Sequence, residues 1–157
     1  MFLYTENMQI ETIIRDYIKD IVHMSIATSR NNKPWISEVH YSYDDELNLY
    51  FISRPSRRHS VEAAENSQIA GNIIKQHDKG ESVRGVYFEG TIEMLEDVTE
   101  EDTAFQTYHQ RFNNDASVLA EQAEENGHRW YKITVQKFYL FDELEMEPAG
   151  KHELDWK

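Results

Sequence analysis

The sequence contains no cysteine, and it has only 3 prolines and 6 glycines among its 157 residues. Without cysteine the chain cannot build a disulfide scaffold, a thiolate zinc site or an iron–sulfur cluster held by thiolates. The low glycine and proline content excludes collagen-like and low-complexity chains. No apolar run approaches the roughly 20 residues of a membrane-spanning helix, and the first residues do not resemble a secretory signal. We therefore expect a cytoplasmic, single-domain protein that does not enter membranes.

Basic residues are also scarce. The chain has 16 Lys and Arg against 29 Asp and Glu, which gives a formal net charge of −13 with histidine neutral. A surface this acidic repels phosphate backbones at long range, so we expect no nucleic-acid partner. Solubility is the simplest explanation of the excess acid.

The hydrophobic pattern changes from a helical to a strand period near residue 21. Apolar residues from Ile10 to Ile21 recur on one helical face. Alternation then predicts strands over 24–28, 34–43 and 47–52, with a turn at 30–33 whose residues tolerate positive φ. Further strands are expected over 69–74, 83–95 and 130–141. Gly85 and Gly90 suggest bends or a close backbone approach, and the change of phase at Gln136–Lys137 predicts a β-bulge.

Three more segments have helical patterns. They cover residues 56–66, a stretch from Thr99 with three acids in its first turn, and 115–125. About six strands and three or four helices predict an α+β fold built around an antiparallel barrel. This domain should span residues 1–142, and residues 143–157 should form an acidic surface tail.

One segment, residues 53–60, combines cations with a strand-to-helix junction. It holds Arg54, Arg57 and Arg58 together with His59 and hydroxyl residues. The first turn of a helix favours acids, so arginines placed there have the wrong sign. Backbone N–H groups, guanidinium groups, an imidazole and hydroxyls at one point would bind an anion, best a phosphate. Alternatively, Arg57 and Arg58 pair with surface acids.

Other chemical motifs are missing. The 7 histidines show no metal-binding spacing, so we expect no metal site. The sequence has no nucleophile elbow, no P-loop and no dinucleotide-binding glycine motif. The catalytic residues, if there are any, are unknown from the sequence. The many aromatic residues are typical of a core, and they are also compatible with stacking on a flat ligand.

The order of several segments resembles a known family. Residues 26–29, 34–44 and 49–53 resemble the opening strands of the pyridoxamine 5′-phosphate oxidase-like, FMN-binding split barrels. Residues 58–60 with 65–71, then 85–91, 131–135 and 139–142, resemble the helix and strands that follow in the family. The resemblance covers about residues 10–142 and is strongest to a poorly characterised bacterial branch. It implies an antiparallel split β-barrel with flanking helices, and a homodimer with FMN at the subunit interface.

The resemblance also implies which residues would hold FMN. Ser53, Arg58 and His59 would hold the phosphate, and Arg57 would assist. Ser37, Glu38, Val39 and His40 would line the isoalloxazine, largely through backbone groups.

The chain also departs from the oxidase that names the family. That enzyme has a lysine where this chain has His59, and a glutamine near the flavin where Gly85 falls. Its C-terminal arginine and histidine, which hold pyridoxal phosphate, have no match in residues 153–157. We therefore expect an FMN-dependent oxidoreductase that acts on another small molecule, and not vitamin B6 oxidation. The alternatives are a flavin- or haem-binding protein without turnover, and an interaction module without a cofactor.

Overall fold

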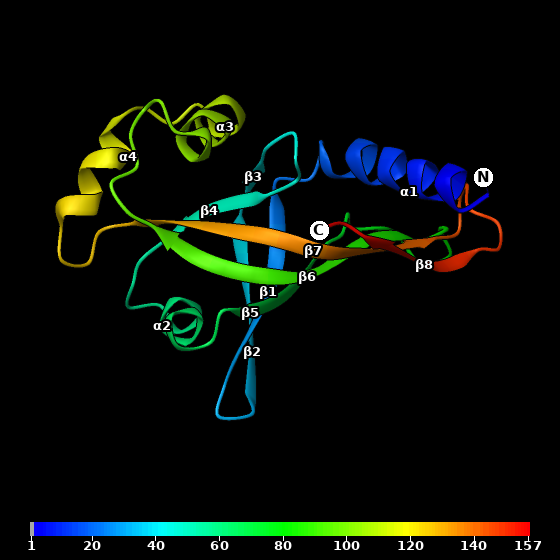
Figure 1. The fold of residues 1–157 in the computed structure, drawn as a ribbon, viewed down its shortest axis with the longest axis horizontal. Helices are drawn as coiled ribbons and strands as arrows, with labels where there is room; N and C mark the ends of the chain where they lie inside the picture. Colours follow the sequence, from blue (N-terminus) through cyan, green and yellow to red (C-terminus); the bar gives the residue numbers. More distant parts are fainter. Residues whose placement is uncertain (1) are drawn as a thin grey trace.

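The computed structural model describes residues 2–157, with side chains described from residue 4 onward. Eight strands form one sheet, and helices flank it (Figure 1). The elements in chain order are α1 (Phe2–Ile18), β1 (His23–Arg30), β2 (Lys33–His40), β3 (Ser42–Tyr43), β4 (Leu49–Ser53), α2 (Arg58–Glu65), β5 (Gln68–Ile73), β6 (Arg84–Leu95), α3 (Thr103–Phe112), α4 (Ser117–Ala120), a 3₁₀ turn (Glu121–Ala123), β7 (Arg129–Asp142) and β8 (Gly150–Asp155).

The sheet is antiparallel throughout, in the order β2-β1-β5-β6-β7-β4-β3, with β8 added beside β7. It curls so that β2, at one end of this order, contacts β4, near the other end. No ladder of backbone hydrogen bonds joins β2 to β4 among the described residues, so the barrel is split there. The structure confirms the predicted α+β split barrel with flanking helices.

Local sequence signals explain several of these elements. Asn31 and Asn32 form the β1–β2 turn with φ of 51° and 58°, a conformation that asparagine tolerates better than most residues. The predicted bulge is confirmed: Glu89 pairs with Lys137 and Gly90 with Val135, which leaves Gln136 as the extra residue of β7.

Gly90 lies at the same irregularity of the β6–β7 ladder. A Cβ atom on Gly90 would lie 2.1 Å from the carbonyl oxygen of Thr134. The close approach suggested by the sequence is therefore confirmed at this glycine, whereas at Gly85 the nearest atom is a side-chain carbon of Ile74, at 3.3 Å.

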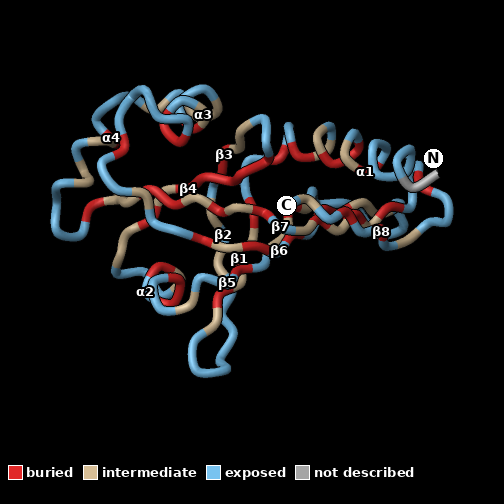
Figure 2. The backbone as a smooth tube through the Cα atoms, in the orientation of Figure 1, coloured by how far each residue is buried: buried red, intermediate tan, exposed pale blue. Residues whose placement is uncertain are grey.

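The main core lies between the sheet and α1. The helical face predicted from the sequence is buried, with Ile10, Ile14 and Ile18 almost fully covered. Figure 2 shows buried residues along the strands and along the inner side of α1. A second, smaller core forms where α3 packs on β4 and β7, around Trp130 and Tyr108. None of the helices in the described part of the chain is long and apolar enough to cross a membrane.

Two predictions need correction. The helix expected from Thr99 begins at Thr103, because Asp102 accepts hydrogen bonds from the backbone N–H and the hydroxyl of Thr99 and so closes a turn ahead of the helix. The stretch expected to be helical over 115–125 contains only α4 and one 3₁₀ turn.

The expected surface tail is replaced by β8, a strand paired with β7. Met146, His152 and Leu154 are buried there. The carbonyl of Gln136, at the bulge, accepts hydrogen bonds from the backbone N–H groups of Trp156 and Lys157. Acidic residues of the segment lie on the exposed positions between these anchors, which explains why its composition resembles a tail.

Candidate functional site

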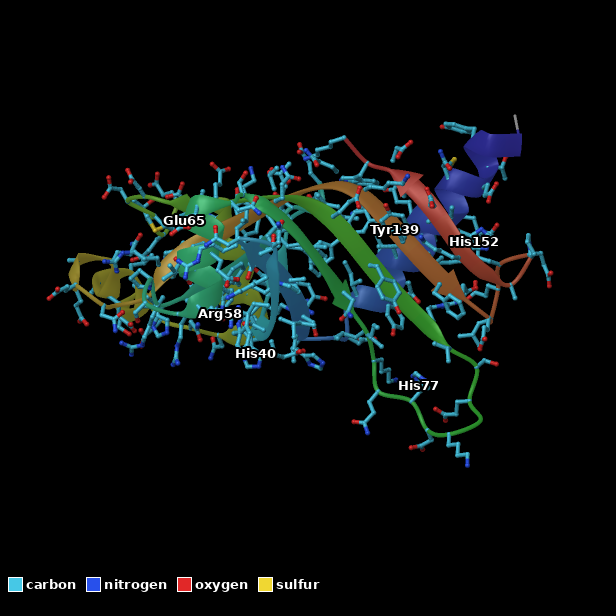
Figure 3. All side chains as sticks on the ribbon, turned by 90° about the horizontal axis from the view of Figure 1, so that it is seen from below. His40, Arg58, Glu65, His77, Tyr139 and His152 are labelled. Carbon is cyan, nitrogen blue, oxygen red and sulfur yellow. The ribbon has the colours of Figure 1, made fainter. Side chains whose placement is uncertain are left out.

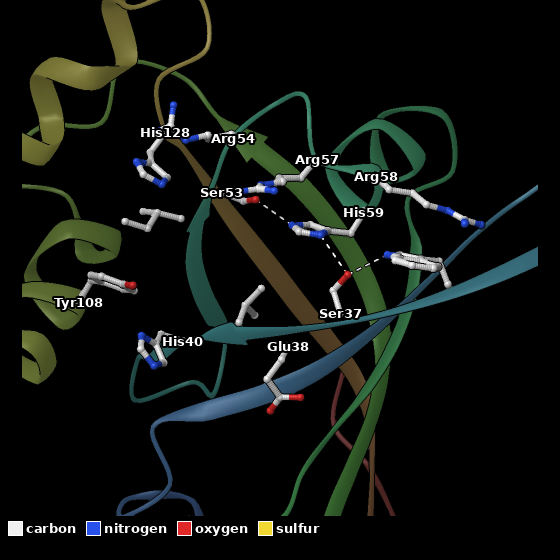
Figure 4. A pocket seen from close by; sticks show the side chains of 13 residues that line it. Ser37, Glu38, His40, Ser53, Arg54, Arg57, Arg58, His59, Tyr108 and His128 are labelled. Atoms are coloured by element: carbon white, nitrogen blue, oxygen red, sulfur yellow. Dashed lines mark hydrogen bonds between the residues drawn. The ribbon is translucent and has the colours of Figure 1, made fainter.

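A cavity of about 730 Å³ lies at the split of the barrel, between β2, β4, the start of α2 and α3 (Figure 4). All eight residues predicted for FMN binding line it: Ser37, Glu38, Val39, His40, Ser53, Arg57, Arg58 and His59. The fold thus brings together two segments that are distant in the sequence, residues 37–40 and residues 53–59. Their cofactor-binding role stays a prediction.

The first turn of α2 forms one wall of the cavity. Arg57 occupies the N-cap position without a capping hydrogen bond from its side chain, and no acid lies in the first turn. Helix geometry leaves the first N–H groups of α2 without intrahelical partners. In the described part of the chain, the Arg57 guanidinium has no hydrogen bond and no ion pair. It lies near Ser53 and His59 (Figure 4). Among the described residues, Arg54, Arg111 and Arg129 also lack a carboxylate partner, but their guanidinium groups donate to backbone carbonyl oxygens, which that of Arg57 does not.

Arg58 has a different environment. Its Nε donates to Glu62 Oε1 at 2.8 Å, and its guanidinium lies 4.2 Å from the centre of the Trp35 ring. Glu62 is buried and also accepts a hydrogen bond from the Thr28 hydroxyl at 2.7 Å. Hydrogen bonds from Arg58 and Thr28 hold the pKa of Glu62 below its usual value. The charge of Arg58 is therefore matched inside the protein, unlike that of Arg57.

His59 connects the two sides of the split. Its Nε2 lies 2.8 Å from Ser53 Oγ on β4, and its Nδ1 lies 3.1 Å from Ser37 Oγ on β2. Ser37 Oγ also accepts a hydrogen bond from Trp35 Nε1 at 2.9 Å. Burial lowers the pKa of His59, and the nearby charge of Arg57 lowers it further, against a smaller opposing effect of Glu62. Burial and the charge of Arg57 thus both favour the neutral imidazole.

Strand β2 supplies the rest of the predicted site. Among the described strands it pairs only with β1, so its outer edge carries free backbone polar groups. The Glu38 carboxylate turns to the Ser25 hydroxyl at 2.7 Å, which leaves the backbone of β2 to face the cavity. His40 stacks on Phe112 of α3 with ring centres 5.3 Å apart.

The sequence reasoning missed five further lining residues: Trp35, Ile52, Arg54, Tyr108 and His128. Arg54 belongs to the cationic segment recognised in the sequence, and its Nη1 donates to the carbonyl of Asn126 at 2.8 Å. Tyr108 and His128 come from elements more than 40 residues further along the chain, and no local pattern links them to the site.

The histidines do not gather elsewhere. Figure 3 shows His77 and His152 far from His40 and Arg58. Within residues 2–157 the structure brings no three His, Asp or Glu side chains together as a metal ion would require.

The fold and the cavity at its split define a split-barrel protein. The chain belongs to the pyridoxamine 5′-phosphate oxidase family, whose model matches residues 10–142. A UPF0306 protein of Pasteurella multocida is 31% identical over 81 residues, which are 51% of this chain and 54% of that protein. The chain thus spans about half the length of this relative.

Two solved structures share the fold at low identity. The haem storage protein HutZ of Vibrio cholerae has a TM-score of 0.67 and 14% identity, over 87% of this chain and 98% of that chain. A haem-binding protein of Mycobacterium smegmatis has a TM-score of 0.64 and 13% identity, over 86% and 53%.

Proposed function

We propose that the cavity at the barrel split binds FMN and that the protein is a flavin-dependent oxidoreductase of a small molecule. The observation that carries this proposal is the unmatched charge of Arg57 beside the free N–H groups of α2, inside a cavity of a pyridoxamine 5′-phosphate oxidase family member. These groups suit a phosphate.

The rest of the cavity suits the remainder of FMN. A volume of about 730 Å³ falls in the range of about 300–1,000 Å³ that is usual for small-ligand sites. The free edge of β2 offers backbone donors and acceptors to a flat, polar ring. A bound flavin supplies the electron-transfer chemistry, while the residues of the chain bind and orient it. We do not extend the proposal to vitamin B6, because residues 153–157 offer no match for the C-terminal arginine and histidine that hold pyridoxal phosphate in the oxidase that names the family.

We also propose a homodimer. The aromatic and aliphatic side chains of Trp35 and Ile36 are 40% and 63% exposed on the edge strand that borders the cavity. A second copy would cover them and complete the cavity wall. Light scattering should give twice the chain mass of 18.6 kDa, and Ile36→Asp should shift the protein toward a monomer. A wild-type monomer at micromolar concentration would refute the dimer.

The test of FMN binding is a visible spectrum of the purified protein followed by a titration with FMN. Arg57→Glu should weaken FMN binding at least tenfold, because it replaces a charge-assisted hydrogen bond with repulsion. Lys33→Glu is the matched control: Lys33 lies on β2 outside the cavity lining, and the substitution changes the net charge equally. Equal affinities of the two variants would reject the site, and no saturable binding by the wild type would reject the flavin.

Haem is the second candidate, because HutZ and the mycobacterial neighbour are named for haem and the imidazoles of His40 and His128 line the cavity. Glu121 Oε2 lies 2.5 Å from His128 Nδ1, which would orient the ring and leave its other nitrogen free for iron, so either His40 or His128 would serve as a haem ligand. A Soret band that His40→Ala or His128→Ala shifts would support haem, and the absence of any Soret band after haem addition would exclude it.

A further inference from the structure

The hydrogen-bond partners of His59 allow the ring to exist in two protonation states. Both ring nitrogens face hydroxyl oxygens, Ser53 Oγ at 2.8 Å and Ser37 Oγ at 3.1 Å. A hydroxyl can donate or accept. Both the neutral and the cationic imidazole can therefore be satisfied here without moving any heavy atom.

The charges around the ring decide which state is populated. Glu62 matches Arg58, whereas Arg57 is unmatched, and the Glu38 carboxylate turns away to Ser25. The charged or titratable groups that line the cavity with His59, or act on its charge, are Arg57, Arg58 and Glu62 of α2 and its N-cap, Arg54 after β4, Glu38 and His40 of β2, Tyr108 of α3, and His128 before β7. Burial and Arg57 keep the ring neutral, and an anion placed beside it would reverse this balance.

The proton also changes what Ser53 can do. When Ser53 donates to a neutral ring, its hydroxyl hydrogen is not available to a ligand. A cationic ring donates from both nitrogens, so Ser53 accepts and its own hydrogen is released toward the cavity. Ser37 then accepts from both His59 and Trp35, which fills its two lone pairs. One proton on His59 thus adds a charge and also provides a further donor for an anion.

We infer that the cavity binds an anionic group together with one proton, and that His59 accepts this proton. One proton passes from solvent to the ring nitrogen that lacked it, and no other covalent bond changes. The identity of the anion as the phosphate of FMN rests on the proposed function. The coupling itself applies to any phosphate monoester that reaches Arg57 and His59.

The test is the dissociation constant of FMN between pH 7 and pH 9. A phosphate monoester is already a dianion in this range, since its second pKa is about 6. Because phosphate raises the pKa of His59 from a lowered starting value, the wild type should bind FMN more weakly as the pH rises from 7 toward the raised pKa, by at most tenfold per pH unit, and its affinity should level off above that pKa. His59→Lys should bind with no such slope, because lysine keeps its charge to about pH 10. His59→Gln should bind more weakly and also without the slope. A flat wild-type profile, or a wild-type slope retained in His59→Gln, would overturn the inference.

A second measurement separates this inference from the flavin proposal. NMR titration of the His59 ring, with and without saturating inorganic phosphate, should show its pKa rise by about 1–3 when phosphate is present. If FMN does not bind but this rise occurs, the flavin proposal fails and the proton coupling stands. If FMN binds and phosphate leaves the His59 titration unchanged, the coupling is wrong and the flavin proposal stands.

Discussion

Replacing Gly90 by alanine tests the close approach of the β6 and β7 backbones at the bulge. The new Cβ would lie 2.1 Å from the Thr134 oxygen and 3.0 Å from both the Thr134 carbonyl carbon and the Val135 Cα. All three atoms are backbone of the paired strand, so relief requires the ladder to open. We expect the upper end of the usual overpacking cost, about 3 kcal/mol. For a chain of this size this cost corresponds to a fall in Tm of about 6–12 °C.

Gly85→Ala is the matched control on the same strand. The nearest atoms to its Cβ are side-chain carbons of Ile74 and Tyr87, at 3.3 and 3.4 Å, and side chains can adjust. Removing a glycine also restricts the unfolded chain, which favours the folded state by about 0.4–1 kcal/mol. Calorimetry or circular dichroism should therefore show Gly85→Ala within about 3 °C of wild type. Equal Tm values for the two variants would refute the steric reasoning.

Three further predictions concern the core and two titrating groups. Ile14→Ala should lower the free energy of unfolding by about 2–5 kcal/mol, because Ile14 is fully buried; a loss below about 1 kcal/mol in urea would place α1 outside the cooperative core. Asp142→Asn should cost about 3 kcal/mol, because Asp142 is buried and accepts from Arg84 Nε at 2.6 Å. Burial alone would raise the pKa of Asp142, but hydrogen bonds from Arg84 and from two backbone N–H groups lower it. The contribution of Asp142 to the free energy of unfolding is therefore complete above about pH 4, and it is lost as the pH falls through the lowered pKa of Asp142. If Asp142→Asn and the wild type showed the same acid denaturation, this prediction would be contradicted. The pKa of His59 is also lowered on folding, so the unfolded chain binds the proton more readily and stability falls as pH drops below about 6.5. In His59→Gln the stability should no longer fall between neutral pH and about pH 6 for this reason. If the stability–pH profiles of the variant and the wild type superimposed, His59 would not be the cause of the fall.

Sequence periodicity predicted elements whose signals are local. The helical face of Ile10, Ile14 and Ile18, the asparagine turn and the bulge at Gln136 each depend on residues close together in the chain. The start of α3 was wrong because Asp102 bonds to Thr99 in a turn, which the acid-rich pattern does not distinguish from a first helical turn. The segment of β8 was mistaken for a tail because alternate residues are exposed and acidic, whereas its pairing with β7 is a long-range property.

The candidate site was predictable in part for the same reason. Arginines at the start of a helix, where acidic residues are favoured, can be recognised from a short stretch of sequence. This pattern indicated Arg57 and Arg58. Part of the difference between the two arginines is also local, since Glu62 lies four residues after Arg58 in α2, whereas Val61 lies four residues after Arg57. The burial of Glu62 and its hydrogen bond from Thr28 of β1 depend on tertiary packing. Tyr108 and His128 reach the cavity only through tertiary packing.

The unmatched Arg57 has a kinetic consequence for ligand capture. An approaching anion first meets the field of a molecule with net charge −13, and it feels the local cation only near the cavity mouth. Dissolved salt shortens the reach of both fields to about 8 Å at physiological ionic strength, which removes the distant repulsion while leaving contact attraction largely in place. The association rate constant of a phosphate ligand should therefore rise with added salt at low ionic strength, the reverse of electrostatically steered binding to a cationic protein. Buffers of very low salt, usually chosen to strengthen phosphate binding, would slow its capture here.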